Sequence, residues 1–225
     1  MAKRSLSSHI RTAFRDLLID LRSSRRPVKV WDRPYVFILG FNKTATTTLH
    51  HFFEGNGFPS IHWDQGHLAR TMLRNCMQDQ RILAGYDDRF LVFSDLILHT
   101  SRIRIEANAL FRVLDRDYPG AYFLFNNRPV GDWIGSRNRK KCQRYGMTFT
   151  ELDQVIFAAK RPEDVFSRWE DEKSRFEREV RDYFLGHPRY LEFEISDPNV
   201  PDLIAKLLGR PMDGSCWGHY RTNAA

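Results

Sequence analysis

The sequence of 225 residues predicts a single three-layer α/β domain with a mainly parallel sheet flanked by helices. Short apolar runs alternate with segments of helical periodicity, which is the order of parallel strands joined by crossover helices. The run YVFILG at 35–40 is apolar throughout, as expected for a strand buried on both faces. The length suits one domain, and a content of 42% hydrophobic and 28% charged residues is typical of a folded chain.

Five strands and three helices are expected. The strands are predicted at 35–40, 58–63, 89–96, 121–128 and 189–195. Helices are predicted at 46–54, which ends at the Gly-Asn-Gly run 55–57, at 104–118, which ends at Pro119-Gly120, and through 174–184. Pro162 and the charged residues around it indicate a loop or a helix boundary rather than a linker between domains.

Residues 1–30 are predicted to form a basic amphipathic extension that precedes the α/β domain at 31–225. Its apolar residues recur at helical spacing, with arginines between them: Ile10, Phe14, Leu17, Leu18 and Leu21. We interpret this segment as a helix that packs on the domain or on a partner. Peripheral contact with a membrane surface is the second interpretation, which the acidic residues Asp16 and Asp20 make weaker.

The formal net charge of +7 favours an anionic partner, which includes nucleotides, nucleic acids, anionic lipids and acidic glycans. The three cysteines are far apart and form no CxxC pair, which argues against a disulfide framework or a structural zinc site and fits a reducing cytosol. We found neither a run long enough to span a membrane nor the pattern of a signal peptide. A cytoplasmic location is therefore expected.

The stretch FILGFNKTATTTLH at 37–50 has the pattern of a strand, a phosphate-binding loop and the start of a helix. Amides at a helix N-terminus bind anions, Lys43 adds a positive charge, and the threonines at 44, 46, 47 and 48 add hydroxyl groups. The Walker pattern is absent, because no second glycine precedes the lysine. In the simpler alternative, Thr46 or Thr47 only caps the helix and Lys43 is solvated.

The segment FNKTATTTL resembles the 5′-phosphosulfate loop of sulfotransferases that use 3′-phosphoadenosine 5′-phosphosulfate (PAPS), in particular those of bacterial type. The resemblance implies a fold similar to that of P-loop NTPases. It also implies that the donor is bound by Lys43, Thr44, Ala45, Thr46, Thr47 and Thr48. Ala45 stands where the family usually has glycine, a departure that should be tolerated if its backbone stays near-helical.

A second segment, NNRPVGDWIGSR at 126–137, resembles the 3′-phosphate motif of the same family. In that motif an arginine at a strand end is followed eight positions later by a serine on a helix, and Arg128 and Ser136 keep this spacing. A guanidinium and a hydroxyl together suit one phosphate monoester. The resemblance covers most of 35–219 and includes the Tyr-Pro-Gly turn at 118–120 and the segments EREVRDYF and LLGRP; Arg221 is a candidate contact of the adenine.

The family resemblance implies that Lys43 neutralises charge on the leaving nucleotide and that a histidine or a carboxylate acts as the general base. Three residues are candidates for the base: Asp95, His62 and Asp64. His62 has the convenient pKa, whereas either carboxylate needs a pKa raised by burial. His62, Asp64 and His67 also have a spacing that metal sites show, but we interpret this spacing as chance, since PAPS chemistry needs no metal.

The sequence therefore predicts a cytosolic sulfotransferase that moves a sulfuryl group to a hydroxyl or an amine of a small molecule or glycan. Its acceptor pocket is expected in the segments 61–88, 96–106 and 145–175. One alternative is a P-loop nucleotide kinase, for which the motif GxxxxGK[ST] is missing. Another is a non-catalytic protein that binds a nucleotide or nucleic acid, for which the basic cluster is RNRKK at 137–141. We expect this cluster to lie beside a nucleotide phosphate, with no nucleic-acid partner.

Overall fold

The computed structural model describes residues 31–218, so the predictions for the extension 1–30 and for Arg221 lie outside the described residues. A five-stranded sheet forms the centre of the fold, and its strand order is β2-β3-β1-β6-β9. All four neighbouring pairs are parallel, which confirms the predicted sheet. The strands are β1 (Val36–Ile38), β2 (Ser60–His62), β3 (Val92–Ser94), β6 (Tyr122–Asn127) and β9 (Tyr190–Glu194).

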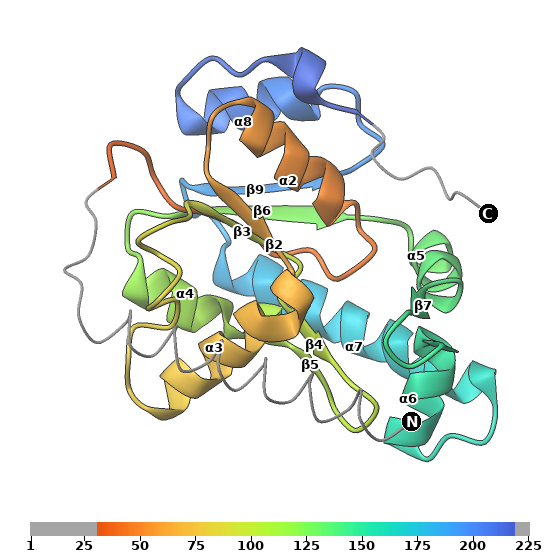
Figure 1. The fold of residues 1–225 in the computed structure, drawn as a ribbon. Helices are drawn as coiled ribbons and strands as arrows, with labels where there is room; N and C mark the ends of the chain where they lie inside the picture. Colours follow the sequence, from red (N-terminus) through yellow and green to blue (C-terminus); the bar gives the residue numbers. More distant parts are fainter. Residues whose placement is uncertain (1–30, 219–225) are drawn as a thin grey trace.

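Helices cover both faces of this sheet (Figure 1). One face carries α2 (Thr46–Gly55) and α8 (Val200–Leu208). The other face carries α3 (His67–Met77), α4 (Phe111–Asp117) and α7 (Pro162–Tyr183). At one end lie α5 (Val130–Asn138), α6 (Phe149–Phe157) and the short hairpin of β7 (Lys141–Cys142) and β8 (Met147–Thr148).

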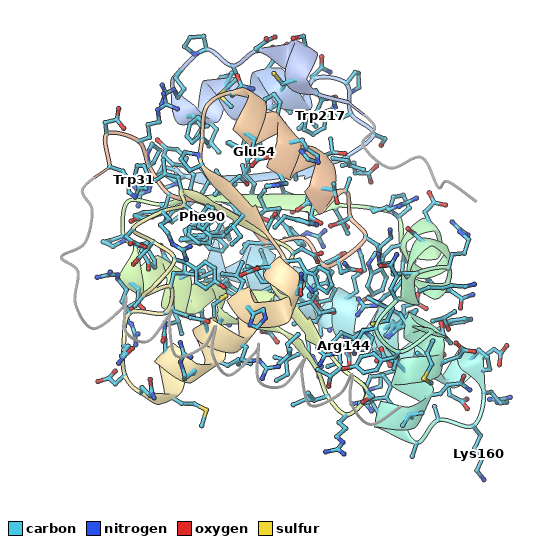
Figure 2. All side chains as sticks on the ribbon, viewed as in Figure 1. Trp31, Glu54, Phe90, Arg144, Lys160 and Trp217 are labelled. Atoms are coloured by element: carbon cyan, nitrogen blue, oxygen red, sulfur yellow. The ribbon has the colours of Figure 1, made fainter. Side chains whose placement is uncertain are left out.

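Alternation along the buried strands produces two separate hydrophobic cores. In β1, Val36 and Ile38 belong to the core under α2 and α8, while Phe37 packs in the core against α3, α4 and α7. Both sets are fully buried, which is why the strand reads as one continuous apolar run. Figure 2 shows side chains filling the layers above and below the sheet.

Most predicted elements are confirmed, and one is wrong in part. The segment 104–118 is not one helix: it begins as strand β5 (Arg104–Glu106), which pairs antiparallel with β4 (Ile97–His99), continues through a 3₁₀ turn at Ala107–Leu110, and becomes α4 only at Phe111. The pairing with β4 overrides the helical periodicity of these first residues. Helix α7 is longer than predicted and starts at Pro162, at the helix position where a missing amide proton costs no hydrogen bond.

The structure also describes the cysteines and the apolar character of the helices. Cys76, Cys142 and Cys216 are all free thiols. Within residues 31–218, none of the helices combines the length and the apolar character that crossing a membrane requires.

Replacing Phe123 by alanine should lower the free energy of unfolding by about 3–5 kcal/mol, the usual cost of a large cavity in a core. Phe123 is fully buried on β6, and its ring centroid lies 4.6 Å from that of Phe184 and 5.4 Å from that of Phe37. Urea unfolding followed by circular dichroism measures the change. Leu185→Ala, at an exposed position, is the control and should change stability little; equal losses would contradict the described core.

Candidate functional site

The side chain of Asn126, a fully buried residue of β6, holds the loop between β1 and α2 by hydrogen bonds. The backbone amide of Gly40 donates to Asn126 Oδ1 at 3.0 Å. Asn126 Nδ2 donates in turn to the carbonyl oxygen and the hydroxyl of Thr44, at 2.5 and 2.8 Å. A Cβ atom at position 40 would lie 2.3 Å from Asn126 Oδ1, so these hydrogen bonds require a glycine there.

Two other buried side chains hold the same loop. Asn108 Nδ2 donates to the carbonyl oxygens of Leu39 and Gly40, at 2.8 and 3.1 Å. The indole of Trp133, on α5, donates to the carbonyl oxygen of Asn42 at 2.8 Å. The sequence analysis missed Asn108 and Asn126 as positioning residues. The sequence does contain a signal for Asn126, because two adjacent asparagines end an apolar strand. A buried side-chain amide needs hydrogen-bond partners, so such a residue is expected to hold a neighbouring segment.

The loop contains two residues in the left-handed region of backbone space, Lys43 with φ 76° and Ala45 with φ 64° and ψ 29°. The backbone at Ala45 is therefore left-handed and does not meet the condition, a near-helical conformation, under which alanine was expected to be tolerated. The left-handed conformation explains why glycine would suit position 45: a Cβ atom makes the left-handed region cost about 1–2 kcal/mol. Helix α2 begins one residue later, and the amides of Thr46 and Thr47 have no carbonyl partner within the helix. Together with the helix dipole, they form an anion-binding end.

The four threonines of this loop have different surroundings. Thr44 is buried, and its hydroxyl donates to the carbonyl oxygen of Phe41 at 2.7 Å while accepting from Asn126. Its hydroxyl therefore serves the loop itself, which differs from the expectation that it faces an anion. Thr46 and Thr48 are also buried, whereas Thr47 is half-buried with its Oγ1 3.3 Å from Nε2 of His62.

The structure brings two of the three candidate bases together. His62 ends β2 and Asp95 directly follows β3, and His62 Nε2 lies 3.4 Å from Asp95 Oδ2. The other ring nitrogen of His62 lies 3.0 Å from the hydroxyl of Ser94. Asn42, from the loop after β1, donates to both carboxylate oxygens of Asp95 at 3.0 and 3.1 Å. The sequence presents His62 and Asp95 as alternatives, and the fold makes them one pair.

Burial raises the pKa of Asp95 from its ordinary value to about 6. The amide of Asn42 opposes this shift by stabilising the carboxylate, and Glu106 adds to it while Arg137 and Lys140 oppose it. A carboxyl group with a pKa near 6 can accept a proton at neutral pH and release it readily. His62 Nε2 lies 3.4 Å from this carboxylate, close enough to exchange a proton with it.

Asp64, the third candidate, accepts a hydrogen bond of 2.5 Å from the hydroxyl of Tyr86, which follows α3. It lies in a left-handed run, with φ values of 60°, 48° and 56° at Trp63, Asp64 and Gln65. Among the described residues 31–218, His62, Asp64 and His67 do not bring their donor atoms close enough together to hold one metal ion.

Arg128 directly follows β6, and its Nη1 lies 3.4 Å from the carbonyl oxygen of Lys43. The two motifs, which are 85 residues apart in the sequence, therefore meet at the carboxyl edge of the sheet. Ser136 is partly buried in the last turn of α5. Beside Arg128 lies a cavity of about 270 Å³ lined by Asn127, Arg128, Pro129, Val130, Lys173, Ser174, Glu177 and Glu194.

Within the basic run at 137–141, Arg137 does not face solvent, whereas Arg139 and Lys141 are exposed. Arg137 is fully buried, and its Nη2 donates to Glu106 Oε1 at 2.7 Å. Arg104 pairs with the same carboxylate at 3.1 Å and with Asp153 at 3.0 Å. This buried ionic network joins the hairpin β4–β5 to α5, α6 and α7. It contributes to the electric field at Asp95 through Arg137 and Glu106.

No family model and no curated protein matches the chain. Among solved structures, one similar chain is a gluconokinase from Sinorhizobium meliloti 1021, with a sequence identity of 15% and a TM-score of 0.38. The match covers 78% of this chain and 90% of that chain. Similarity of this degree carries no argument about activity, so the interpretation of the site depends on its own geometry.

Ala45→Gly should raise the free energy of unfolding by about 0.5–1 kcal/mol, because relief of left-handed strain exceeds the added entropy of the unfolded chain. Ala158, which is also left-handed with φ 52°, gives a matched comparison and should show a gain of the same sign. Ala205→Gly, inside α8, should instead lose about 0.5–1 kcal/mol. Thermal and urea unfolding measure all three; a loss of stability in Ala45→Gly would contradict the described loop.

Asp95→Asn should gain stability relative to the wild type as the pH rises from about 4 to 6. The folded-state pKa of Asp95 is raised to about 6, so folding takes up a proton in this window and the wild type loses stability with rising pH. The asparagine variant lacks this loss. Urea unfolding at pH 4, 5, 6 and 8 measures the difference. A stability difference that is constant across these pH values would contradict the raised pKa.

Proposed function

We propose that this chain is a sulfotransferase that transfers a sulfuryl group from PAPS to a hydroxyl or an amine of a small molecule or glycan. One observation carries the proposal: Arg128 contacts the carbonyl group of Lys43, so the two segments that resemble the donor motifs lie together. The groups at this edge fit a nucleotide with anions at both its 5′ and 3′ positions. They comprise a helix N-terminus, a lysine and a strand-end arginine with a serine on the next helix.

In this proposal each chain residue has a defined role toward the donor. Lys43 and the amides of Thr46 and Thr47 bind the 5′ anion, and Arg128 and Ser136 bind the 3′-phosphate. PAPS itself supplies an activated sulfuryl group on a phosphate leaving group. Lys43 stabilises the negative charge that develops as this bond breaks. The cavity beside Arg128 offers room for part of the nucleoside.

The pair of His62 and Asp95 takes the proton from the acceptor in this proposal. Thr47, on the anion-binding helix, lies 3.3 Å from His62, so the base and the anion-binding end are in contact. Asp95, with a pKa of about 6, orients the imidazole and shares the proton that His62 receives. The base is then the pair as a unit, and Asp64 is the weaker candidate because its carboxylate is bound to Tyr86.

A P-loop kinase is the second candidate, and the position of Asp95 favours it. Asp95 follows β3, the neighbour of β1, and a carboxylate there can hold the magnesium ion of a bound nucleotide. The hydroxyl beside the lysine would then also bind the metal. Against this, the hydroxyl of Thr44 is bound to Phe41, and both oxygens of Asp95 accept hydrogen bonds from Asn42. These contacts favour the sulfotransferase.

Calorimetric titration with 3′-phosphoadenosine 5′-phosphate in the presence of a chelator should show binding to the wild type. Arg128→Ala should weaken this binding about ten- to a hundredfold, because it removes hydrogen bonds from a charged donor. Lys43→Ala should also weaken it. Arg178→Ala, an exposed arginine on α7, makes the same change of charge and should bind like the wild type. A wild type that ignores this nucleotide and instead binds ATP tightly with magnesium would overturn the proposal and support the kinase.

A further inference from the structure

Three metal-binding side chains converge on one turn of α2, in a part of the helix that the proposed function does not use. His50, His51 and Glu54 each offer one possible ligand atom, and these atoms all lie within 4.8 Å of one another. His50 Nε2 is 3.3 Å from Glu54 Oε2, and His51 Nδ1 is 3.6 Å from the same oxygen. Glu54 is labelled on α2 in Figure 2, above the sheet.

The two separations that involve Glu54 Oε2 match the spacing of ligands around a tetrahedral zinc ion. Zinc binds imidazole nitrogen at about 2.0–2.1 Å and carboxylate oxygen at about 2.0–2.2 Å, which places two ligand atoms about 3.3–3.5 Å apart. The two measured nitrogen–oxygen distances therefore need little change to hold the ion. Two imidazoles and one carboxylate are a ligand set typical of zinc sites that keep a fourth position open.

The ring of His50 is held from its other side. Its Nδ1 lies 2.8 Å from the hydroxyl of Ser60, a buried residue of β2. A hydrogen bond at this nitrogen fixes the orientation of the ring and leaves Nε2 directed toward Glu54, as the outer partners of metal-binding histidines do. His50 is also stacked on His62, with ring centroids 5.6 Å apart.

We infer that His50, His51 and Glu54 form a site for a divalent transition-metal ion, with zinc as the best fit. His50 Nε2, His51 Nδ1 and Glu54 Oε2 are the ligands, and a water completes the coordination. The side chains of His51 and Glu54 are 40% and 47% exposed, so an ion can enter from solvent. The ion would stiffen α2 one turn beyond the anion-binding end and restrict His50, which packs on His62. The inference does not depend on the proposed function.

The test is a zinc titration of the full chain, prepared without a histidine tag and stripped of metal. The wild type should bind one zinc ion in calorimetry, and zinc should raise its unfolding temperature. Glu54→Gln and His51→Gln should each weaken binding at least tenfold and abolish the thermal shift. Glu170→Gln, an exposed glutamate on α7, makes the same change as Glu54→Gln away from the cluster and should behave like the wild type.

The visible absorption of bound Co²⁺ distinguishes an ion held at one site from ions bound loosely at scattered surface groups. Co²⁺ at this site should show the strong visible absorption of a four- or five-coordinate ion, and both variants should lose that absorption. Both substituted side chains are substantially exposed, so the variants should keep the circular dichroism of the wild type. If the wild type binds no zinc, or if it and the two variants titrate alike, the inferred site does not exist.

Discussion

The hydrogen bonds between the side chain of Asn126 and the loop after β1 are the constraint on which the candidate site depends. They connect β6 to the loop at the point where the chain leaves β1. They also fix Gly40 and Thr44, which stand at the two ends of the turn. The amides of Asn108 and the indole of Trp133 complete the support. Without these buried donors, the carbonyl groups of the loop would lack partners, which costs about 1–3 kcal/mol for each group.

Most of the residues with a strained, left-handed backbone lie near the loop after β1 and its hydrogen-bond partners. Within 31–218, six of the eight non-glycine residues with positive φ lie in or next to the candidate site: Lys43, Ala45, Asp95 and the run 63–65. Asp79 and Ala158 lie elsewhere. Such conformations persist only where surrounding contacts fix them, and they cluster at functional sites. At Asp95 the contacts come from Asn42 and His62, so the loop after β1 also holds the residue after β3. The same turn therefore positions both the start of α2 and the pair of His62 and Asp95.

The sequence predicted the sheet well because a strand buried on both faces leaves a continuous apolar run. It also placed Lys43, Asp95 and Arg128 at strand ends, and in parallel sheets these ends share one edge. It failed where long-range contacts decide the outcome. The helical periodicity at 104–118 did not reveal the pairing of β5 with β4, and the run at 137–141 did not reveal that Arg137 is buried against Glu106. The pairing of His62 with Asp95 likewise depends on the adjacency of β2 and β3.

The distribution of charge at this edge has a consequence for any anion that binds there. The positive groups are Lys43, Arg128 and the first amides of α2. The carboxylate of Asp95 is buried. An anion bound there would add negative charge near Asp95, which would raise the pKa of its carboxyl group further. Release of the anion reverses this shift. Thr47 contacts His62 and His62 contacts Asp95, so a chain of direct contacts joins the start of α2 to this carboxyl group.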